Sequence, residues 1–316
     1  MVKNALKSLR RTLRTAAGDR GEAALLLSGK EMAWRVACMP PNTDFRRVGF
    51  KVFSQFDEDG IIQYLINKLP IANRTFIEFG VENYEESNTR FLLLNDHWQG
   101  MVLDARGADI RYIQRAKIYW QFDLQAKQTW ITRENINELL LGASFGEDVG
   151  LLSIDIDGND YWIWEAIHSV RPRILIIEYN SLFGLQPIAV PYQEDFQRTA
   201  AHYSNLYYGA SLGALDYLAS KKGYLLLGSN VLGHNAFFVR QDVAQEFRGL
   251  SLPEAYVESK FRESRDRAGN LTHLRGADRL RLIQDMPVVQ VETGETGTLK
   301  DLWEAPSLVA SVPALK

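Results

Sequence analysis

Short apolar runs alternate with segments of helical periodicity through the middle of the chain. Each run is bounded by polar residues or glycine, which is typical of a buried strand. Five runs are predicted as strands: 75–80, 100–105, 118–124, 149–157 and 173–180. The segments between them place apolar residues at helical spacing, as in 86–95, 132–142 (with Thr132 as N-cap) and 160–168. Strands that alternate with helices of about ten residues predict parallel βαβ units.

The pattern changes near the end of this region. A helix at 211–223 precedes two apolar runs, 224–230 and 234–240, with only residues 231–233 between them. So short a link predicts an antiparallel pair at the sheet edge. We therefore expect an α/β fold with a doubly wound, mostly parallel seven-stranded sheet.

Regions outside this pattern divide the chain into three parts. Residues 1–70 are predicted to be a helical N-terminal region, 71–242 the core, and 243–316 a charged, weakly periodic C-terminal extension. The extension is expected to wrap the core or to contact a second copy of the chain. Residues 1–20 predict a basic amphipathic helix, which could pack on the body, on a partner chain, or on an anionic membrane surface.

Composition narrows the function classes. The 316 residues are 46% hydrophobic and carry a net charge of −3, which gives no basic footprint for nucleic acid. The single cysteine, Cys38, excludes an internal disulfide and a cysteine-rich zinc site. No apolar run reaches the length of a membrane span, and residues 1–20 lack a signal-peptide core. We therefore expect a cytoplasmic protein. The alternative is a cytoplasmic protein that contacts the membrane surface through residues 1–20.

Acidic residues stand at the end of each of the first five predicted strands. In an open α/β sheet, ligands bind beyond the carboxyl ends of the strands. One acid there is commonly a helix N-cap, but five in succession indicate a site. The polar residues and glycine at these ends are Glu78, Gly80, Asp104, Asp123, Asp155, Asp157, Glu178 and Asn180.

The first two strand ends indicate the type of cofactor. Asp104 lies 26 residues beyond Glu78, close to the spacing at which an acid binds the ribose hydroxyls of an adenosine cofactor. The first loop, "EFGVENYEESN", offers only Gly80 and adds three further acids, so it would repel a pyrophosphate. S-adenosylmethionine has no phosphate and carries a cationic sulfonium, and it is therefore compatible with this loop.

Four segments together resemble the class I S-adenosylmethionine-dependent methyltransferases: "TFIEFG", "VLDA", "LLSIDIDGND" and "ILIIEYN". The resemblance covers about residues 50–240 and is strongest to the FkbM-type and related sugar O-methyltransferases. It implies S-adenosylmethionine as cofactor and a sugar or glycoside as acceptor. The chain departs from the family by lacking the second and third glycines of the first loop.

The resemblance also implies roles for individual residues. Glu78 and Gly80 would shape the methionine end of the site, Asp104 would hold the ribose, and Asp123 would lie near the adenine. Asp155 would sit beside the methyl donor. The contacts of the missing glycines would pass to Asn83 and Asn88.

The sequence "DIDGND" at 155–160 has three interpretations. As a calcium loop it fails, because Asp160 stands where glycine is needed and Ala166 where a bidentate acid is needed. As a D-x-D motif it would suit a metal-dependent nucleotide-sugar glycosyltransferase. As the fourth strand end of a methyltransferase it could hold Mg²⁺ or Mn²⁺ through the set Asp157, Glu178 and Asn180. Asp160 is expected to cap the following helix.

The remaining candidates concern the base and the acceptor. Without a metal, Asp157 or Glu178 would act as the general base; His234 and His202 are further candidates, and His234 is better placed because it opens a predicted strand. The loop 181–208, with Tyr192, Tyr203 and Tyr207, is predicted to be an acceptor lid. The sequence thus predicts an O-methyltransferase acting on a sugar hydroxyl in polysaccharide or glycoside biosynthesis. A homo-oligomer is compatible with this prediction. A glycosyltransferase and a non-catalytic scaffold with the same fold stay open.

Overall fold

The computed structural model describes residues 21–302. The basic helix expected in residues 1–20 lies outside the described residues. The described chain begins with helical residues 21–37, followed by α2 (Phe45–Val48) and α3 (Glu58–Lys68), which lead into the sheet. Among residues 21–302, none of the helices combines the length and the apolar character needed to cross a bilayer.

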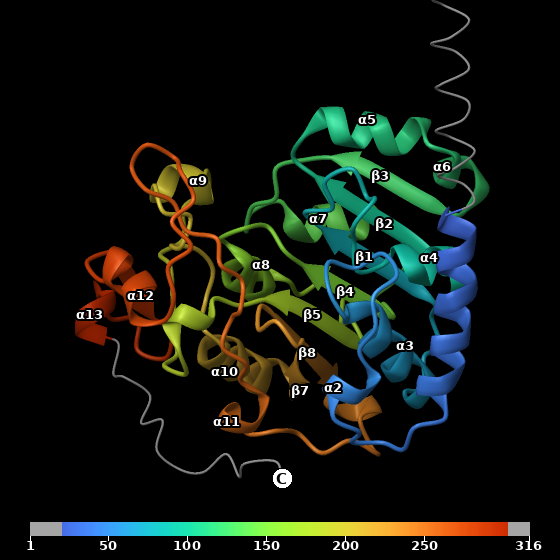
Figure 1. Ribbon diagram of the computed structural model, residues 1–316. Helices are drawn as coiled ribbons and strands as arrows, with labels where there is room; N and C mark the ends of the chain where they lie inside the picture. Colours follow the sequence, from blue (N-terminus) through green and yellow to red (C-terminus); the bar gives the residue numbers. More distant parts are fainter. Residues whose placement is uncertain (1–20, 303–316) are drawn as a thin grey trace, which may run out of the picture.

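A seven-stranded sheet forms the centre of the molecule (Figure 1). Its strands are β1 (Thr75–Phe79), β2 (Gln99–Asp104), β3 (Leu124–Gln128), β4 (Leu151–Ile154), β5 (Ile174–Glu178), β7 (Tyr224–Ser229) and β8 (Asn235–Arg240). They lie in the order β3-β2-β1-β4-β5-β8-β7. β8 runs antiparallel to β5 and to β7, whereas β1 to β5 pair in parallel. The expected fold class, a doubly wound and mostly parallel sheet, is confirmed.

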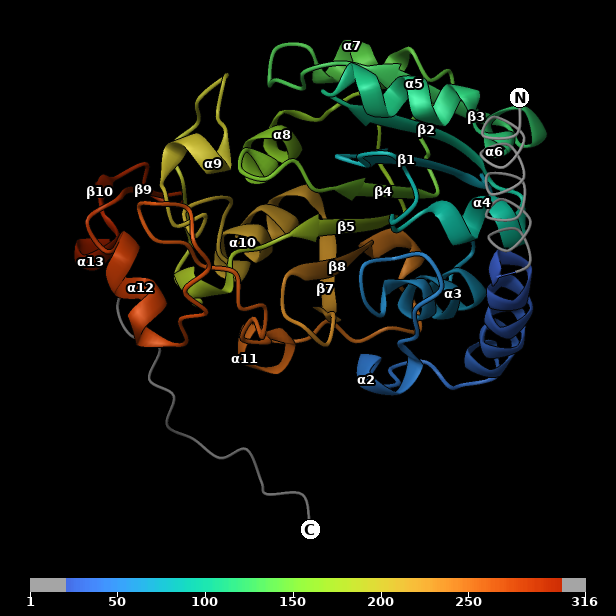
Figure 2. The same ribbon diagram turned by 45° about the horizontal axis from the view of Figure 1, so that its top comes forward.

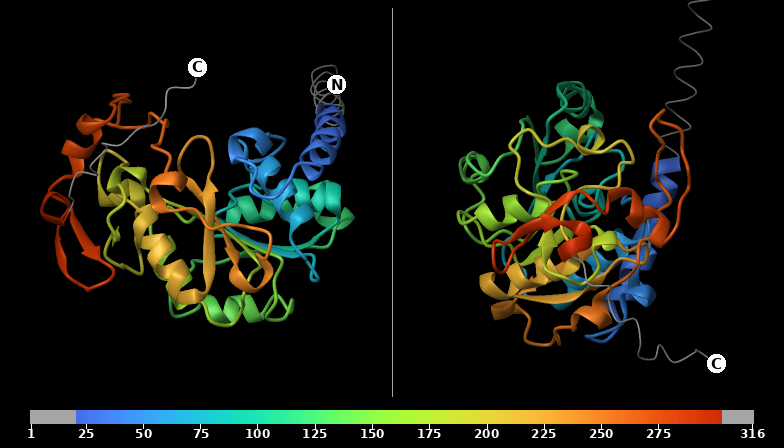
Figure 3. Two further views of the ribbon diagram at one scale, coloured as in Figure 1. Left: turned by 90° about the horizontal axis from the view of Figure 1, so that it is seen from below. Right: turned by 90° about the vertical axis from the view of Figure 1, so that its left-hand side faces the viewer.

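Helices cover both faces of this sheet (Figure 3, left). Alternate strand residues point to opposite faces, so Phe76 joins one apolar core and Ile77 the other. The first core is covered by α3, α4 (Arg90–Asp96), α5 (Gly107–Arg115) and α6 (Lys117–Gln121). The second is covered by α7 (Ile136–Leu141), α8 (Asp160–Ala166) and α10 (Leu212–Lys222).

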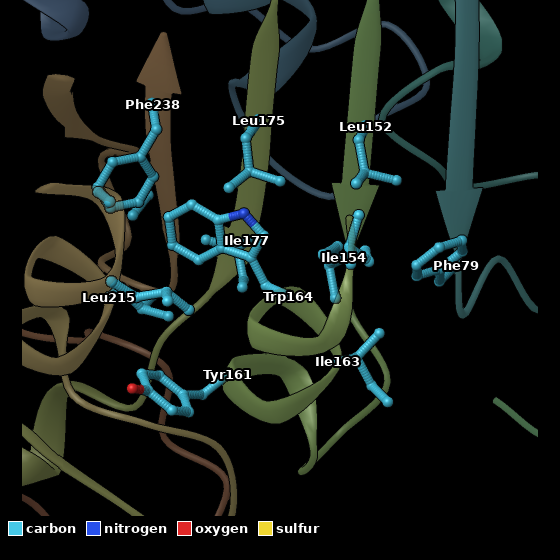
Figure 4. Close-up of a cluster of buried hydrophobic side chains, with 14 of the residues drawn as sticks. Phe79, Leu152, Ile154, Tyr161, Ile163, Trp164, Leu175, Ile177, Leu215 and Phe238 are labelled. Atoms are coloured by element: carbon cyan, nitrogen blue, oxygen red, sulfur yellow. The ribbon is translucent and has the colours of Figure 1, made fainter. Parts of the chain in front are cut away.

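Trp164 of α8 is a core residue. Figure 4 shows it lying over β5 against Ile177, with Phe238 of β8 beside it. The ring centroids of Trp164 and Phe238 are 5.4 Å apart. The apolar periodicity of residues 160–168 therefore serves packing of α8 on the sheet, and the acids just before it are held at the edge.

The strand predicted at 118–124 is wrong. Residues 117–121 form α6, which buries Ile118 and leaves Trp120 72% exposed. β3 follows at the sheet edge, and it buries only alternate residues, Leu124 and Ala126. Likewise α7 begins at Ile136 with Asn135 as N-cap, later than the Thr132 start that the sequence predicts.

A smaller lobe lies beyond the carboxyl ends of β4 and β5 (Figure 2). Its three-stranded sheet joins β6 (Ile188–Ala189) to β9 (Pro287–Gln290) and β10 (Thr296–Thr298). Around it lie η1 (Ser181–Phe183), α9 (Arg198–Ala201), α12 (Ala277–Ile283) and α13 (Leu299–Leu302). The short η2 (Gln241–Val243) and α11 (Leu252–Ala255) connect β8 to this lobe. The described part of the C-terminal extension, up to residue 302, thus packs on the segment that follows β5.

Candidate functional site

A cavity of about 630 Å³ opens at the carboxyl ends of β1, β2, β4 and β5, between the sheet and the smaller lobe. Its volume lies within the range of roughly 300–1,000 Å³ that is usual for small-molecule sites. Most of the residues predicted for the site line it, namely Glu78, Gly80, Asn83, Asn88, Asp104, Asp155, Asp157, Glu178 and His234. Asp123 and Asn180 are absent from this lining.

Asp104 is fixed at the end of β2 by the loops on either side of it. Its Oδ2 accepts a hydrogen bond from the backbone N–H of Glu82 at 2.8 Å, and its Oδ1 accepts one from Arg106 at 2.7 Å. Each carboxylate oxygen can accept a further bond. The side chain is therefore preorganised, and its free lone pairs are available to a ligand with two neighbouring hydroxyls.

Gly80 allows the ends of β1 and β4 to approach closely. It has a φ of +70°, and a Cβ at this position would lie 1.7 Å from the carbonyl oxygen of Asp155. Only glycine meets both conditions. This glycine consequently sets how near the Asp155 region lies to the first loop.

Glu78 is buried beneath that loop and shapes it. Its Oε1 accepts from the Asn88 backbone N–H at 2.8 Å, while Oε2 accepts from the N–H and the Oγ1 of Thr89. Burial raises the pKa of Glu78 to about 7, against the opposing effect of these donors. The side chains of Asn88 and Asn83 also bond within the protein, to Ser153 and to the Glu85 N–H respectively. All three residues build the wall of the cavity.

The structure does not bring Asp123 to the cavity. This residue precedes β3, because the strand begins at Leu124. It therefore lies at the amino ends of the strands, whereas Asp104 lies at their carboxyl ends. The residues that follow β3 on the cavity side are Thr129, Trp130 and Ile131. These residues, and not Asp123, form the cavity wall beyond β3.

Three carboxylates converge where β4 and β5 end. Asp155, Asp157 and Glu178 each offer an oxygen, and the three oxygens lie within 4.8 Å of one another. Burial, and then mutual repulsion, raise the pKa of Asp155 and of Glu178 well above the usual range. The buried Oε2 of Glu178 has no hydrogen-bond partner among the described residues. Such a group requires a proton or a cation.

The loop that carries these acids is held by Asp160. Its Oδ1 accepts from the N–H of Ile156 at 2.8 Å and its Oδ2 from that of Gly158 at 2.9 Å. Asp157 between them adopts a left-handed conformation with φ +58°. The expected cap is not found: Asn159 is the N-cap of α8, and Asp160, its first residue, instead fixes the turn that presents Asp157.

Asn180 does not belong to the carboxylate group. Its side-chain oxygen accepts from the N–H of Leu182, and its amide donates to the carbonyls of Leu206 and Tyr208. Both amide hydrogens are thus used by the protein, and the side-chain oxygen caps η1. The groups that the structure brings together are therefore Asp155, Asp157 and Glu178, without Asn180.

His234 lines the cavity at the start of β8. Its Nε2 lies 3.1 Å from Gln55 Oε1 and 4.0 Å from Glu58 Oε1, and its buried Nδ1 has no partner within residues 21–302. Burial lowers the pKa of His234, which favours the neutral ring, against the opposing effect of Glu58. His202 does not line the cavity; its Nδ1 lies 2.7 Å from Ser204 Oγ.

Two arginines that the sequence did not reveal enter the site. Arg198 donates from Nη1 to Asp157 Oδ1 at 2.7 Å, and its guanidinium lies 3.8 Å from the centroid of the Tyr208 ring. Arg279 comes from α12. No strand-end pattern marks either residue. Gln55 also enters the lining, from the acid-rich segment 54–60 before the first strand, which is a signal that could have been followed.

The aromatic residues on the cavity wall differ from those predicted for the lid. Trp130, Phe196, Tyr208 and Phe261 line the cavity, whereas Tyr192, Tyr203 and Tyr207 do not. Tyr192 instead donates to Glu134, and Tyr207 is buried in the core of the smaller lobe. The loop 181–208 does border the cavity, but through Phe196, Arg198 and Tyr208.

Sequence comparisons match this chain to no protein-family model and to no curated protein. Solved structures similar to it include the N-terminal domain of EvdMO1 with SAH bound (11% identity, TM-score 0.38), covering 66% of this chain and 94% of that one. Another is an S-adenosylmethionine-dependent methyltransferase from Clostridium acetobutylicum ATCC 824 (8%, TM-score 0.38, 63% and 92%). A third is a putative caffeoyl-CoA O-methyltransferase from Staphylococcus aureus (14%, TM-score 0.37, 58% and 82%). At these values the similarity is distant, and the cofactor and the activity have to be judged from the geometry of the site.

Proposed function

We propose that this protein is an S-adenosylmethionine-dependent O-methyltransferase that acts on a sugar hydroxyl, in the biosynthesis of a polysaccharide or glycoside. One observation carries the proposal: Asp104 at the end of β2 and the Asp155, Asp157 and Glu178 carboxylates line one cavity. Asp104 suits the binding of an adenosine ribose, and the three carboxylates suit the deprotonation of an acceptor hydroxyl.

The charges of the cavity favour this cofactor over a dinucleotide. Eight of the lining side chains carry a carboxyl group and three carry a guanidinium group. The acids outnumber the arginines even when Glu78, Asp155 and Glu178, whose pKa values burial raises, hold protons. A pyrophosphate would meet repulsion there, whereas a sulfonium and an amino group would be attracted. Asp104 would hold the ribose, Gly80 would border the sulfur end, and residues 129–131 would border the base. S-adenosylmethionine, when bound, supplies a methyl group activated by its positively charged sulfur.

The three carboxylates suit a hard divalent cation. Mg²⁺ and Mn²⁺ prefer oxygen ligands, and Asp155, Asp157 and Glu178 supply three of them in one place. A divalent ion held there would supply Lewis acidity that makes a hydroxyl easier to deprotonate. Arg198 donates to Asp157, so this side chain would have to release the carboxylate when the ion binds.

Without an ion, the same residues can accept the proton of the acceptor hydroxyl. Glu178, whose Oε2 has no hydrogen-bond partner in residues 21–302, and His234, whose pKa burial lowers, both line the cavity. A general base must lie within hydrogen-bond reach of the proton it removes. Trp130, Phe196 and Tyr208 offer aromatic faces on which a sugar ring can pack.

Calorimetry with the full-length protein tests the proposal. S-adenosylmethionine and S-adenosylhomocysteine should bind without added metal, whereas a nucleoside diphosphate sugar should not bind even with Mn²⁺. The reverse result would favour the glycosyltransferase, for which Asp155 and Asp157 would form the D-x-D pair. If neither ligand binds, the chain is a scaffold with this fold. EDTA should abolish methyl transfer but leave cofactor binding intact, and added Mg²⁺ or Mn²⁺ should restore it; full activity in EDTA would make Glu178 or Asp157 the direct base.

A further inference from the structure

Arg279 is a buried cation on the cavity wall that has no ion-pair partner in the described part of the chain. The residue is only 7% exposed, and within residues 21–302 it forms no ion pair. Its Nε has no hydrogen-bond partner there, and its Nη1 reaches the carbonyl oxygen of Ser259 only at 3.5 Å. Burial of an unpaired guanidinium is unfavourable, so the group calls for an anion in the cavity.

The geometry of α12 keeps this side chain directed inward. Arg279 and Ile283 are four residues apart and therefore lie on one face of the helix. Ile283 is completely buried in the apolar core of the smaller lobe. Arg281, on another face, is exposed and pairs with Asp278 at 2.7 Å. Arg279 thus stands at an inward position where a packing role would be better filled by an apolar residue.

Neighbouring groups compensate the charge of Arg279 only in part. Glu258 attracts it through space, but the two form no ion pair among the described residues. Arg198 is itself a cation, and its Nη1 already donates to Asp157. Glu263, the acid of the C-terminal extension that lines the cavity, pairs with Arg265 at 3.0 Å and accepts from Asn205. Burial lowers the pKa of Arg279 against the opposing effects of Tyr208 and Glu258, so the loss of hydration outweighs this partial compensation.

We propose that the acceptor carries an anionic group, a carboxylate or a phosphate, which binds Arg279 while the acceptor hydroxyl lies near Asp155, Asp157 and Glu178. This substrate class rests on the proposed function above. A guanidinium can donate two parallel hydrogen bonds to either group, which fixes both distance and direction. The opposite signs of the two parts of the cavity then orient the acceptor, because its anionic end is repelled by the three carboxylates.

The test uses the full-length protein saturated with S-adenosylhomocysteine and titrated with D-glucuronate, inorganic phosphate and D-glucose. The two anions should bind at least about tenfold more tightly than glucose, as expected for hydrogen bonds to a charged group. Arg279→Gln should lose this preference, and Arg279→Lys should keep part of it because the charge remains. Arg281→Gln, on the same helix but outside the cavity, should behave as the wild type. The tighter of the two anions then distinguishes a carboxylate from a phosphate.

Three results would overturn the inference. The first is the lack of an anion preference that depends on Arg279. Either neither anion binds the wild type better than glucose, or Arg279→Gln leaves the preference unchanged. The second is that Arg279→Gln weakens S-adenosylhomocysteine binding, which would assign the arginine to the cofactor. The third is a fall of several degrees in the melting temperature of unliganded Arg279→Gln, which would make Arg279 a structural residue; removal of an unpaired buried charge should leave that temperature unchanged or raise it. Failure of the wild type to bind S-adenosylhomocysteine at all would instead contradict the proposed function.

Discussion

Arg198 and Asp157 form an ion pair inside the candidate site, with 2.7 Å between Nη1 and Oδ1. The arginine is 18% exposed at its side chain, whereas the aspartate is 61% exposed. Arg198 therefore compensates part of the negative charge that Asp155, Asp157 and Glu178 bring together. A divalent cation at the same carboxylates would compete with it.

The first prediction follows from this competition. Arg198→Gln should bind Mn²⁺ about tenfold more tightly than the wild type, because a nearby positive charge is removed and Asp157 is released. Titration of Mn²⁺ followed by electron paramagnetic resonance measures this affinity. Arg133→Gln, which removes an ion pair with Glu165 outside the cavity, is the control and should not change it. Equal Mn²⁺ affinity in Arg198→Gln and wild type would show that the carboxylates do not bind the ion at this position.

The second prediction concerns Asp104. Asp104→Ala should weaken S-adenosylhomocysteine binding by roughly 2–3 kcal/mol, since hydrogen bonds to a charged group are lost. The loops held by its two oxygens will also relax, so Asp104→Asn, which keeps one acceptor, should lose less. Asp123→Ala, at the amino ends of the strands and far from the cavity lining, should bind like the wild type. An effect of Asp123→Ala as large as that of Asp104→Ala would contradict the assignment of the ribose site.

The central strands could be predicted because each is an apolar run that ends in an acid. β1, β2, β4 and β5 are buried on both faces, so their sequences are nearly continuous apolar stretches, as in "ILII" of β5. The acids after them come together because parallel strands end at the same sheet edge. Glu78, Asp104, Asp155 and Glu178 are thus placed by local pattern alone.

β3 could not be predicted in the same way. Its sequence, "LQAKQ", alternates apolar and polar residues because it is an edge strand with one exposed side. The aromatic stretch just before it resembles a strand more closely, although it forms the helix α6. The error moved the expected strand end back by several residues. It therefore placed Asp123 at the carboxyl end of the strand, although this residue lies at the amino end.

Two of the three cavity arginines depend on long-range packing. Arg198 and Arg279 lie 20 and 101 residues beyond the end of β5 at Glu178, and they reach the cavity only because the smaller lobe folds over it. The sequence contains many arginines, and no spacing separates these two from the solvated ones. Asn180 was misassigned for a related reason, because its partners Leu206 and Tyr208 are distant in sequence.

The third prediction is a pH dependence caused by Glu78. Burial raises its pKa from 4.5 to about 7 in the folded protein, so the folded state holds the proton more tightly than the unfolded state. The contribution of this group to stability is therefore fully present below pH 4.5 and is lost as the pH rises to about 7. Over that window the free energy of unfolding should fall by about 3 kcal/mol through Glu78 alone.

Urea unfolding of Glu78→Gln between pH 4.5 and 7.5 measures this contribution. The variant should show a smaller decline of stability with pH than the wild type. Some decline will remain, because burial also raises the pKa of Asp59 and of Asp160 to about 6. Glu82→Gln, on the same loop but exposed, should keep the wild-type slope. An unchanged slope in Glu78→Gln would mean that the three donors around Glu78 hold it ionised throughout.

The fourth prediction uses two glycines that share a backbone conformation but differ in their surroundings. Gly80 has φ +70° and Gly146 has φ +79°, so an alanine at either position meets the left-handed strain of about 1–2 kcal/mol. At Gly146 the new methyl group would contact nothing within 4 Å, whereas at Gly80 it would overlap the carbonyl oxygen of Asp155. Gly80→Ala should therefore lower the free energy of unfolding by about 2–5 kcal/mol, clearly more than Gly146→Ala. Because the overlap pushes the ends of β1 and β4 apart, Gly80→Ala should also weaken S-adenosylhomocysteine binding, and Gly146→Ala should not. Chemical denaturation and calorimetry on both variants test the pair, and equal effects would show that the close approach of Gly80 to Asp155 does not shape the site.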